Sequence, residues 1–199
     1  KGGRTASGVS AARSHTGALA GSAAVYRAFF RQKGVIQVQN ISEMTAALSL
    51  LAAGRRPGGE KVAILASSGG HAVVAADKCA EAGLEVVQLN GETRRRMAEY
   101  LPSYAGTANP VDFTGIDIVR PGLFRQCASI TASDPGVDAL ILSHWLSQEV
   151  DSLGQLQGLA AETVKPLALA GTVPGRVPSD VLPGLLNSGV AFLGEMETG

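Results

Sequence analysis

The sequence predicts an α/β protein with a doubly wound parallel sheet in three layers, in which helices cover both faces of the strands. Two observations support this fold class. Short apolar runs alternate with helical patterns along most of the chain, and glycine or proline separates many of them. Strands that are each followed by a helix are joined by crossovers, so they run parallel.

The first part of the chain predicts two helices and one short strand. Ser22 suits the N-cap of a helix that continues to Gln32 and ends before Gly34. A strand is expected over residues 35–38, and Ser42 suits the N-cap of a helix through Ala53. The faces expected to be buried consist of Val25, Tyr26, Phe29 and Phe30 in the first helix and of Met44, Ala47, Leu48 and Leu51 in the second.

A breaker, Gly54-Arg-Arg-Pro-Gly-Gly59, then divides the chain into expected domains 1–56 and 57–199. Beyond it, strands are expected at 62–66, 84–89, 137–142, 166–170 and 190–193. Helices are expected at 69–82, 91–100, 122–132, 153–163 and 179–186, with Arg94, Arg95 and Arg96 on a solvent side. Five strands at this spacing indicate a flavodoxin-like domain. The first segment is then the end of another α/β domain.

Composition excludes several classes of protein. The 199 residues are 45% hydrophobic and contain no apolar run of membrane-spanning length. Cys79 and Cys127 are far apart and show neither metal-site nor disulfide spacing, so a reducing cytoplasm is the expected location. The chain opens at Lys1 without a methionine, and we expect it to be a piece of a longer polypeptide.

The net charge of zero conceals an asymmetry along the chain. Residues 1–58 hold eight Lys or Arg and one acid, a net charge of +7, and the remainder holds nine bases and sixteen acids, a net charge of −7. The basic segment suits phosphates or a coenzyme, unless acids outside this sequence balance it. No basic run is interleaved with aromatic residues, so nucleic-acid binding is not expected.

His15 lies in the run Arg13-Ser-His-Thr-Gly-Ala-Leu-Ala-Gly21. Small, hydroxylated and glycine residues predict a flexible loop on which the ring is accessible and backbone N–H groups can hold an anion. A histidine that carries a phosphoryl group needs such surroundings. The alternative is a surface histidine without a role.

Ser67-Ser-Gly-Gly70 follows the first strand of the second domain and opens a helix. At that edge of the sheet, the free N–H groups of the helix N-terminus are expected to hold an anion, with close backbone approach at Gly69 and Gly70 and further hydrogen bonds from Ser67 and Ser68. The motif is neither a dinucleotide fingerprint nor a lysine-bearing phosphate loop, and the alternative is a tight turn that needs glycine.

A second polar loop, Asn109-Pro-Val-Asp-Phe-Thr-Gly115, should reach the same edge. Asn109, Asp112 and Thr114 are candidates for contact with a polar substrate, or for an Asx-turn that braces the loop. The brace is favoured for Asp112, whose apolar neighbours suggest a buried structural carboxylate.

The remaining candidates carry weaker signals. His71, in the first turn of a helix, is expected to be neutral and incidental, with a catalytic role as the alternative. His144 and Trp145 suit a packed loop anchor better than a substrate contact. We find no G-x-S-x-G motif of a Ser/His/Asp triad and no metal-ligand spacing, including around Asp77.

Taken in order, the segments Ser14–Gly21, Phe29–Ile36, Ser67–Gly70 and Asn109–Gly115 resemble nucleoside-diphosphate-forming acyl-CoA synthetases over essentially the whole chain. These are relatives of succinyl-CoA synthetase and of ADP-forming acetyl-CoA synthetases. The resemblance implies an acid–thiol ligase that converts acid, CoA and nucleoside triphosphate to acyl-CoA, diphosphate and phosphate. It implies that His15 is phosphorylated, with Ser14, Thr16 and Gly17 beside the phosphate.

The resemblance also implies partners. A CoA-binding Rossmann domain, an ATP-grasp domain and a supporting glutamate are expected outside this sequence, with CoA, ATP or ADP and Mg bound mainly there. The phosphohistidine is expected between two helix N-termini, of which Ser67–Gly70 supplies one. Asn109, Asp112, Thr114 and Gly115 are expected to border the site of a small carboxylic acid. The complete enzyme is expected to be an oligomer that binds neither nucleic acid nor membrane.

The sequence departs from the family's usual pattern at two points near the helix that Ser67–Gly70 opens, which affects the expected contacts there. His71 replaces a more usual proline, and Ala66-Ser67 replaces a Thr-Asn pair. A related class fuses these domains to an acetyltransferase and loses the histidine, which leaves open a regulatory module that senses CoA or acyl-CoA. A domain that only joins subunits is a third alternative. The presence of His15 favours the enzyme.

Overall fold

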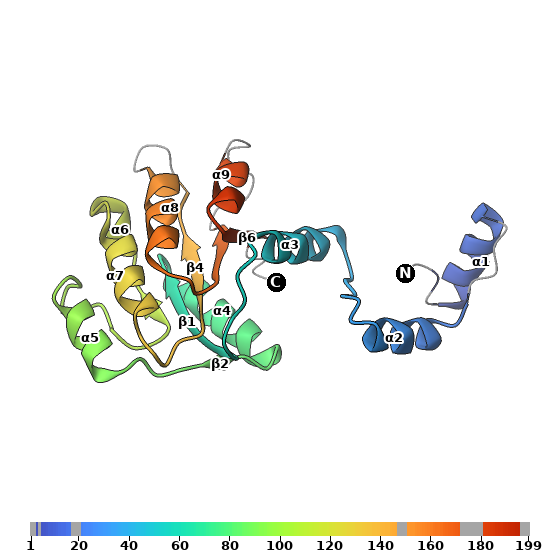
Figure 1. Ribbon diagram of the computed structural model, residues 1–199, viewed down its shortest axis with the longest axis horizontal. Coiled ribbons are helices and arrows are strands. Elements are labelled where there is room, and N and C mark those ends of the chain that lie inside the picture. The colour runs from blue at the N-terminus through green and yellow to red at the C-terminus, as the bar shows by residue number, and fades with distance from the viewer. Residues whose placement is uncertain (1–2, 4, 17–20, 147–150, 172–180, 196–199) are drawn as a thin grey trace. The chain divides into compact units, whose positions relative to one another are not determined.

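A computed structural model describes residues 3, 5–16, 21–146, 151–171 and 181–195 (Figure 1). The chain divides into two compact units, residues 1–44 and residues 45–199. Among the described residues, no helix combines the length and the apolar character needed to cross a membrane.

The first unit contains α1 (Ala6–Thr16), α2 (Ala23–Gln32) and the start of α3 (Ile41–Ala52). The predicted helix at 22–32 is confirmed. The predicted strand at 35–38 is wrong: these residues belong to no strand, and Val35 and Ile36 are 48% and 60% exposed. An isolated apolar run becomes a strand only where a neighbouring strand takes its backbone hydrogen bonds.

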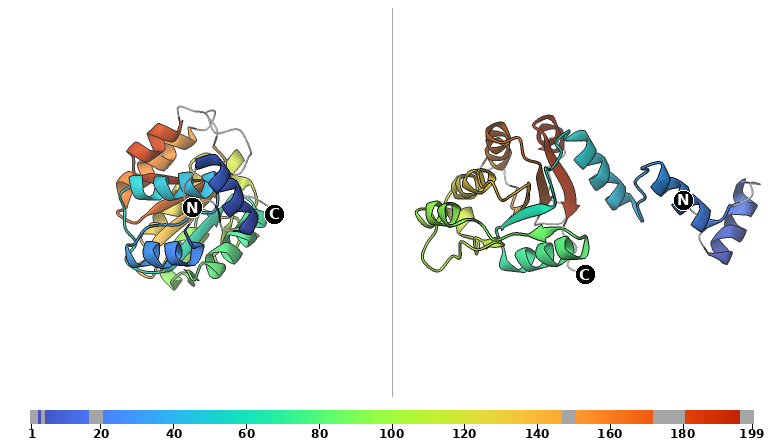
Figure 2. Two further views of the ribbon diagram at one scale, coloured as in Figure 1. Left: turned by 90° about the vertical axis from the view of Figure 1, so that its right-hand side faces the viewer. Right: turned by 60° about the horizontal axis from the view of Figure 1, so that its bottom comes forward.

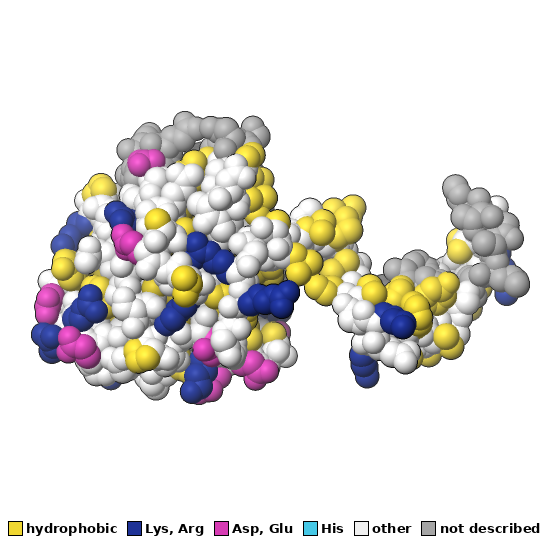
Figure 3. Space-filling model, viewed as in Figure 1, with side chains coloured by type: hydrophobic (Ala, Val, Ile, Leu, Met, Phe, Trp, Pro, Cys, Tyr) yellow, Lys and Arg dark blue, Asp and Glu magenta, His cyan; other side chains and the backbone are white. Residues whose placement is uncertain are grey.

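The apolar faces predicted to be buried in α2 and α3 are not covered within the described structure. No residue of α2 is buried, and Phe29 and Leu51 are 50% and 63% exposed. Figure 3 shows hydrophobic side chains gathered at the surface of both helices. The N-cap of α3 also differs from the prediction, because Asn40, rather than Ser42, accepts the Glu43 N–H at 2.7 Å.

The second unit is built on a parallel sheet with the strand order β2-β1-β4-β5-β6, and β3 pairs with β1 as well. The strands are β1 (Lys61–Ala66), β2 (Glu85–Val86), β3 (Val111–Asp112), β4 (Ala139–His144), β5 (Leu167–Gly171) and β6 (Val190–Glu195). The predicted flavodoxin-like, doubly wound architecture is confirmed. β3 was not predicted, and β2 is shorter than expected.

Helices cover both faces of this sheet, which gives the predicted three layers (Figure 2). One face carries α5, α7, α8 and α9, and α4 lies on the other. The helices are α4 (Gly69–Glu81), α5 (Gly91–Ala98), α6 (Ile116–Val119), α7 (Leu123–Ala132), α8 (Ser152–Glu162) and α9 (Val181–Asn187). The predicted start of the last helix, at 179–180, lies outside the described residues, and the short α6 was not predicted.

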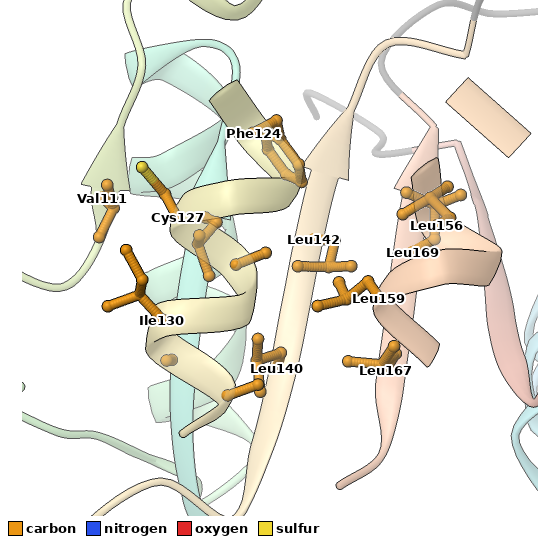
Figure 4. Packing of buried hydrophobic residues seen from close by; sticks show 14 of the residues in the cluster. Val111, Phe124, Cys127, Ile130, Leu140, Leu142, Leu156, Leu159, Leu167 and Leu169 are labelled. Carbon is orange, nitrogen blue, oxygen red and sulfur yellow. The ribbon is translucent and has the colours of Figure 1, made fainter. Parts of the chain in front are cut away.

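The larger core lies between the sheet and the helices α5, α7, α8 and α9. Figure 4 shows the part of it in which residues of α7 and α8 pack against β4 and β5. Leu140 and Leu142 of β4 point to this side and are fully buried, as is Leu159 of α8. Alternate residues of β1 serve the smaller core, where Val62 and Ile64 pack with Ala75 and Cys79 of α4. Burial on both faces explains why the strands are continuous apolar runs.

Asn109 joins β2 and β3 along one edge of β1. β2 pairs with Lys61 and Val62, and β3 pairs with Leu65 and Ala66. Between them, the buried Asn109 amide donates to the carbonyls of Val62 and Val87 at 2.9 and 2.8 Å, and it accepts the Ile64 N–H at 2.8 Å. The Asn109 amide thus makes hydrogen bonds to β1 that the backbone of a neighbouring strand would otherwise make. As a result, β2 ends early and the loop that follows reaches the sheet.

Arg55 holds the breaker segment against the rest of the second unit. Its guanidinium donates to the carbonyls of Ala160, Thr163, Lys165 and Ser188 at 2.6 to 3.3 Å. The Ser49 hydroxyl accepts the Phe192 N–H at 2.6 Å. The two compact units therefore divide after residue 44, upstream of the boundary predicted at residue 56. The domain boundary at residue 56 stays a prediction.

Candidate functional site

The turn from β1 to α4 presents unbonded N–H groups at the carboxyl edge of the sheet. Ser68 is the N-cap residue and has extended backbone angles, but its side chain makes no capping hydrogen bond. The first bond of the helix runs from Ala72 N to Ser68 O at 3.0 Å. Within the described chain, the N–H groups of Gly69, Gly70 and His71 therefore have no acceptor, which is the arrangement that attracts anions.

The two glycines of this turn differ in what surrounds them. A Cβ on Gly69 would lie 2.7 Å from Asp112 Oδ2, whereas a Cβ on Gly70 would meet nothing nearer than Ser68 Oγ at 3.8 Å. A side chain at 69 would therefore have to displace the carboxylate, whereas position 70 has open space. The Asp112 carboxylate also places a negative charge near the N-terminus of α4, where it favours the helix and opposes a bound anion.

The loop 109–115 is braced from within, as the sequence suggested for Asp112. Asp112 Oδ1 accepts the Thr114 N–H at 2.8 Å, which is an Asx-turn, although the carboxylate is half-buried. Gly115 has φ +78°, and its N–H donates to Ser67 O at 2.8 Å. Thr114 is exposed and has φ +48°, and its hydroxyl donates to the Phe113 carbonyl at 2.8 Å.

The side chain of Ser67 points to a buried cluster that sequence reasoning missed. Its hydroxyl donates to Asp117 Oδ2, and its oxygen lies 3.1 Å from His144 Nδ1. Nδ1 is also 3.1 Å from Asp117 Oδ2. The Ser67 N–H donates to the Ser143 carbonyl at 2.9 Å, so both polar hydrogens of Ser67 are bonded to protein groups. The cluster joins the ends of β1 and β4 to α6.

Asp117 is charged and fully enclosed. Burial acts to raise its pKa, but hydrogen bonds from His144 and Ser67 outweigh burial and hold the pKa below its ordinary value. Its Oδ1 is buried without a hydrogen bond. The imidazole of His144 stacks on Phe124, with ring centroids 4.0 Å apart. His144 is thus an anchored side chain at the end of a strand, as the sequence suggested, but its anchor is a carboxylate.

The cluster differs from a hydrolase triad. In such a triad the serine lies at Nε2 and the carboxylate at Nδ1. Here Ser67 and Asp117 both lie at Nδ1, so the serine is not placed for activation by the ring. The cysteines offer no alternative nucleophile, because both are free and buried, and burial raises the pKa of Cys127 to about 12.

His71 lies in the first turn of α4 and is half-buried, with Nδ1 3.3 Å from Ser143 Oγ. No group of three or more His, Cys, Asp or Glu among the described residues could hold a metal ion.

The backbone of His15 lies in a helix, which corrects the loop predicted for it. His15 belongs to the last turn of α1, and its side chain and that of Thr16 are outside the description, as is Gly17 altogether. Ser14 donates to the Ala11 carbonyl at 2.8 Å. Alanines at 6, 11 and 12 favour the helix and override the Ser, Thr and Gly signals.

Comparisons with known proteins identify the family. Residues 62–171, more than half of the chain, match the Ligase-CoA domain. The chain belongs to the Ligase-CoA domain family. Residues 1–51 match the succinyl-CoA ligase like flavodoxin domain, so the predicted resemblance to succinyl-CoA-ligase-like proteins is confirmed.

The relatives of this Ligase-CoA chain include ADP-forming ligases. It is 40% identical to acetate–CoA ligase (ADP-forming) I of Archaeoglobus fulgidus over 71% of its length and 20% of that protein. It is 39% identical to subunit alpha of acetate–CoA ligase (ADP-forming) II of Pyrococcus furiosus, over 71% of its length and 30% of that subunit. The chain thus spans less than a third of these relatives.

A solved structure extends the similarity to the fold of nearly the whole chain. The dinucleotide-forming acetyl-coenzyme A synthetase 1 of Ca. Korarchaeum cryptofilum, in complex with phosphate and ADP, matches with a TM-score of 0.79 at 26% identity. The match covers 96% of this chain and 41% of that one.

Proposed function

We propose that this chain is part of a nucleoside-diphosphate-forming acyl-CoA synthetase, which converts acid, CoA and nucleoside triphosphate to acyl-CoA, diphosphate and phosphate. The observation that carries the proposal is the 40% identity to an ADP-forming acetate–CoA ligase over 71% of the chain. The relatives reported above are named as ligases or synthetases, and none of those names describes a regulatory fusion, so the enzyme is favoured over a CoA-sensing module.

His15 carries the phosphoryl group in this proposal. In the direction of nucleoside triphosphate synthesis, an imidazole nitrogen attacks the phosphorus of an acyl phosphate, and the carboxylate leaves with the electrons of the broken P–O bond. The phosphoryl group then passes to the nucleoside diphosphate. Imidazole suits both transfers because it is nucleophilic near neutral pH. Ser14, Thr16 and Gly17 flank the phosphate.

The start of α4 stabilises the phosphoryl group. The open N–H groups of Gly69 and Gly70 support this role, and Ser68 adds an exposed hydroxyl. Ser67 contributes by fixing the turn, since its hydroxyl is donated to Asp117. The loop with Asp112, Thr114 and Gly115 borders the carboxylic acid, and Asn109 holds that loop in place.

The remaining components belong to the complete enzyme. A CoA-binding Rossmann domain and an ATP-grasp domain supply the sites for CoA and for ATP or ADP with Mg, as separate subunits or as parts of one polypeptide. The assembly is a cytoplasmic oligomer.

The proposal is tested by phosphorylation of the complete enzyme with γ-labelled ATP. An acid-labile, base-stable phosphoprotein is expected, and His15→Ala should abolish it. Gly70→Val is expected to reduce its yield roughly five-fold, because a helix-terminal contact to an anion contributes about 1 kcal/mol. Gly70→Ala is the matched control, since its Cβ has open space. If the label persists in His15→Ala, the proposed role of His15 is wrong.

A further inference from the structure

Ser67 and His144 lie where the winding of the sheet reverses. From β1 the chain first adds β2 on one side and later adds β4 on the other. In open α/β sheets, this switch point is where ligands bind, outside the carboxyl ends of the strands. Ser67 directly follows β1, and His144 is the last residue of β4. The cluster of Ser67, Asp117 and His144 is therefore at the edge where this topology favours a reaction site.

The positions of the protons in the cluster follow from what each group can donate. The ionised Asp117 carboxylate only accepts, and the single hydroxyl hydrogen of Ser67 is already donated to Asp117. His144 Nδ1 lies 3.1 Å from the same carboxylate oxygen, so Nδ1 carries a hydrogen. When the ring is neutral, its lone pair is therefore on Nε2.

Nε2 is the free end of this ring. No described residue forms a hydrogen bond with it. Two polar side-chain atoms among the described residues are fully buried without a hydrogen bond, Asp117 Oδ1 and Arg125 Nε, and Nε2 is not one of them. The His144 side chain as a whole is 6% exposed. The stacking on Phe124 fixes the plane of the ring.

We propose that His144 Nε2 is a general base that accepts the proton of a thiol substrate. This inference rests on the proposed function. In that reaction the carboxylic acid and the phosphates are already ionised at neutral pH. A thiol has a pKa of about 8.5 and is mostly protonated, so it is the reactant that must lose a proton before it attacks.

The step conserves atoms and charge. The thiol sulfur bonds to the carbonyl carbon of an acyl phosphate, the bond from this carbon to the phosphate oxygen breaks, and inorganic phosphate leaves with that electron pair. The thiol proton passes to Nε2 and is later released to solvent. Asp117 acts as a positioning residue, because it holds the ring through Nδ1 and stabilises the imidazolium. His71 contacts the neighbouring Ser143, with Nδ1 3.3 Å from Ser143 Oγ, and is a second titratable side chain for comparison.

The test separates two half-reactions of the complete enzyme. His144→Asn retains an N–H where Nδ1 lies but removes the base. Phosphorylation by ATP should be unchanged, which also shows that the variant is folded. Thioester formation from acyl phosphate and CoA at pH 7 should fall by about 100-fold or more. The loss should shrink as the pH approaches the pKa of the thiol. His71→Asn should not alter this pH dependence.

Each outcome decides between the proposals. Undiminished thioester formation by a phosphorylated His144→Asn enzyme overturns the role of His144 and leaves the proposed function intact. Failure of the unmodified enzyme to become phosphorylated overturns the proposed function instead. If His144→Asn does not fold, the unmodified enzyme still provides a test. The dependence of its thioester formation on pH should differ from the ionisation curve of the free thiol, and a rate that follows the thiol alone contradicts the inference.

Discussion

Asn109 Oδ1 accepts the backbone N–H of Ile64, 45 residues earlier in the chain, at 2.8 Å. The same amide donates to the carbonyls of Val62 and Val87. The Asn109 side chain thus completes the hydrogen bonding of β1. Because it is held there, the following residues of the loop reach the carboxyl edge of the sheet.

Asn109→Ala should lower the free energy of unfolding by at least about 3 kcal/mol, because three buried backbone groups lose their partner and each costs roughly 1–3 kcal/mol. Denaturant unfolding measures the loss. Asn187→Ala, at an exposed asparagine, is the control and should change stability by less than about 0.5 kcal/mol. Equal effects of the two substitutions would show that the Asn109 bridge contributes nothing.

Gly69→Ala should destabilise the protein, and Gly70→Ala should not. The added methyl at 69 would lie 2.7 Å from Asp112 Oδ2 and must displace the carboxylate from its bond to Thr114, whereas the methyl at 70 has open space. Alanine is otherwise the better helix former by about 1 kcal/mol. Thermal unfolding should therefore show a lower midpoint for Gly69→Ala and an equal or higher one for Gly70→Ala. The reverse order would contradict the close approach of Asp112.

Arg55→Lys should destabilise the second unit by about 1–2 kcal/mol although it keeps the charge. The guanidinium reaches four carbonyls with two nitrogens, and an ammonium cannot reproduce that fork. The adjacent Arg56 is exposed, so Arg56→Lys is the control. Chemical denaturation of both variants checks the expectation, which fails if Arg55→Lys is as stable as its control.

The stabilising effect of Asp117 should disappear in acid. Its pKa is lower in the folded protein than in the unfolded chain, so its contribution is complete above the ordinary value of 3.8 and is lost as the pH falls through the lower folded value. The difference in unfolding free energy between the unmodified chain and Asp117→Asn should therefore be present at pH 5 and shrink below pH 4. A difference that grows in acid would mean that the folded pKa is raised.

The repeated strands and helices of the second unit were predictable because their signals are local. Continuous apolar runs marked β1, β4 and β5, and glycines marked where α4 begins and ends. The same local reasoning failed at residues 35–38, where the apolar run has no neighbouring strand, and at His15, where helix-favouring alanines precede the polar run.

The parts of the site that depend on distant partners were not predictable. Asp117 lies on a four-residue helix with no periodic signal, and its partners are 50 residues before it and 27 residues after it. Ser67 was expected to face a ligand, but its hydroxyl faces Asp117. The sequence left open whether Asn109 contacts a substrate or braces its loop. Its hydrogen bonds to Val62, Ile64 and Val87 depend on the fold and could not be predicted from the sequence.

The most direct measurement of the central claim is the location of the phosphoryl group in the complete enzyme. The enzyme is phosphorylated once with ATP and once, from the opposite direction, with acyl-CoA and inorganic phosphate, and the modified peptide is sequenced by mass spectrometry under alkaline conditions. Both reactions should place the group on His15. A phosphoryl group found on His71 or His144, or on different residues in the two directions, would contradict the claim that His15 is the shared carrier.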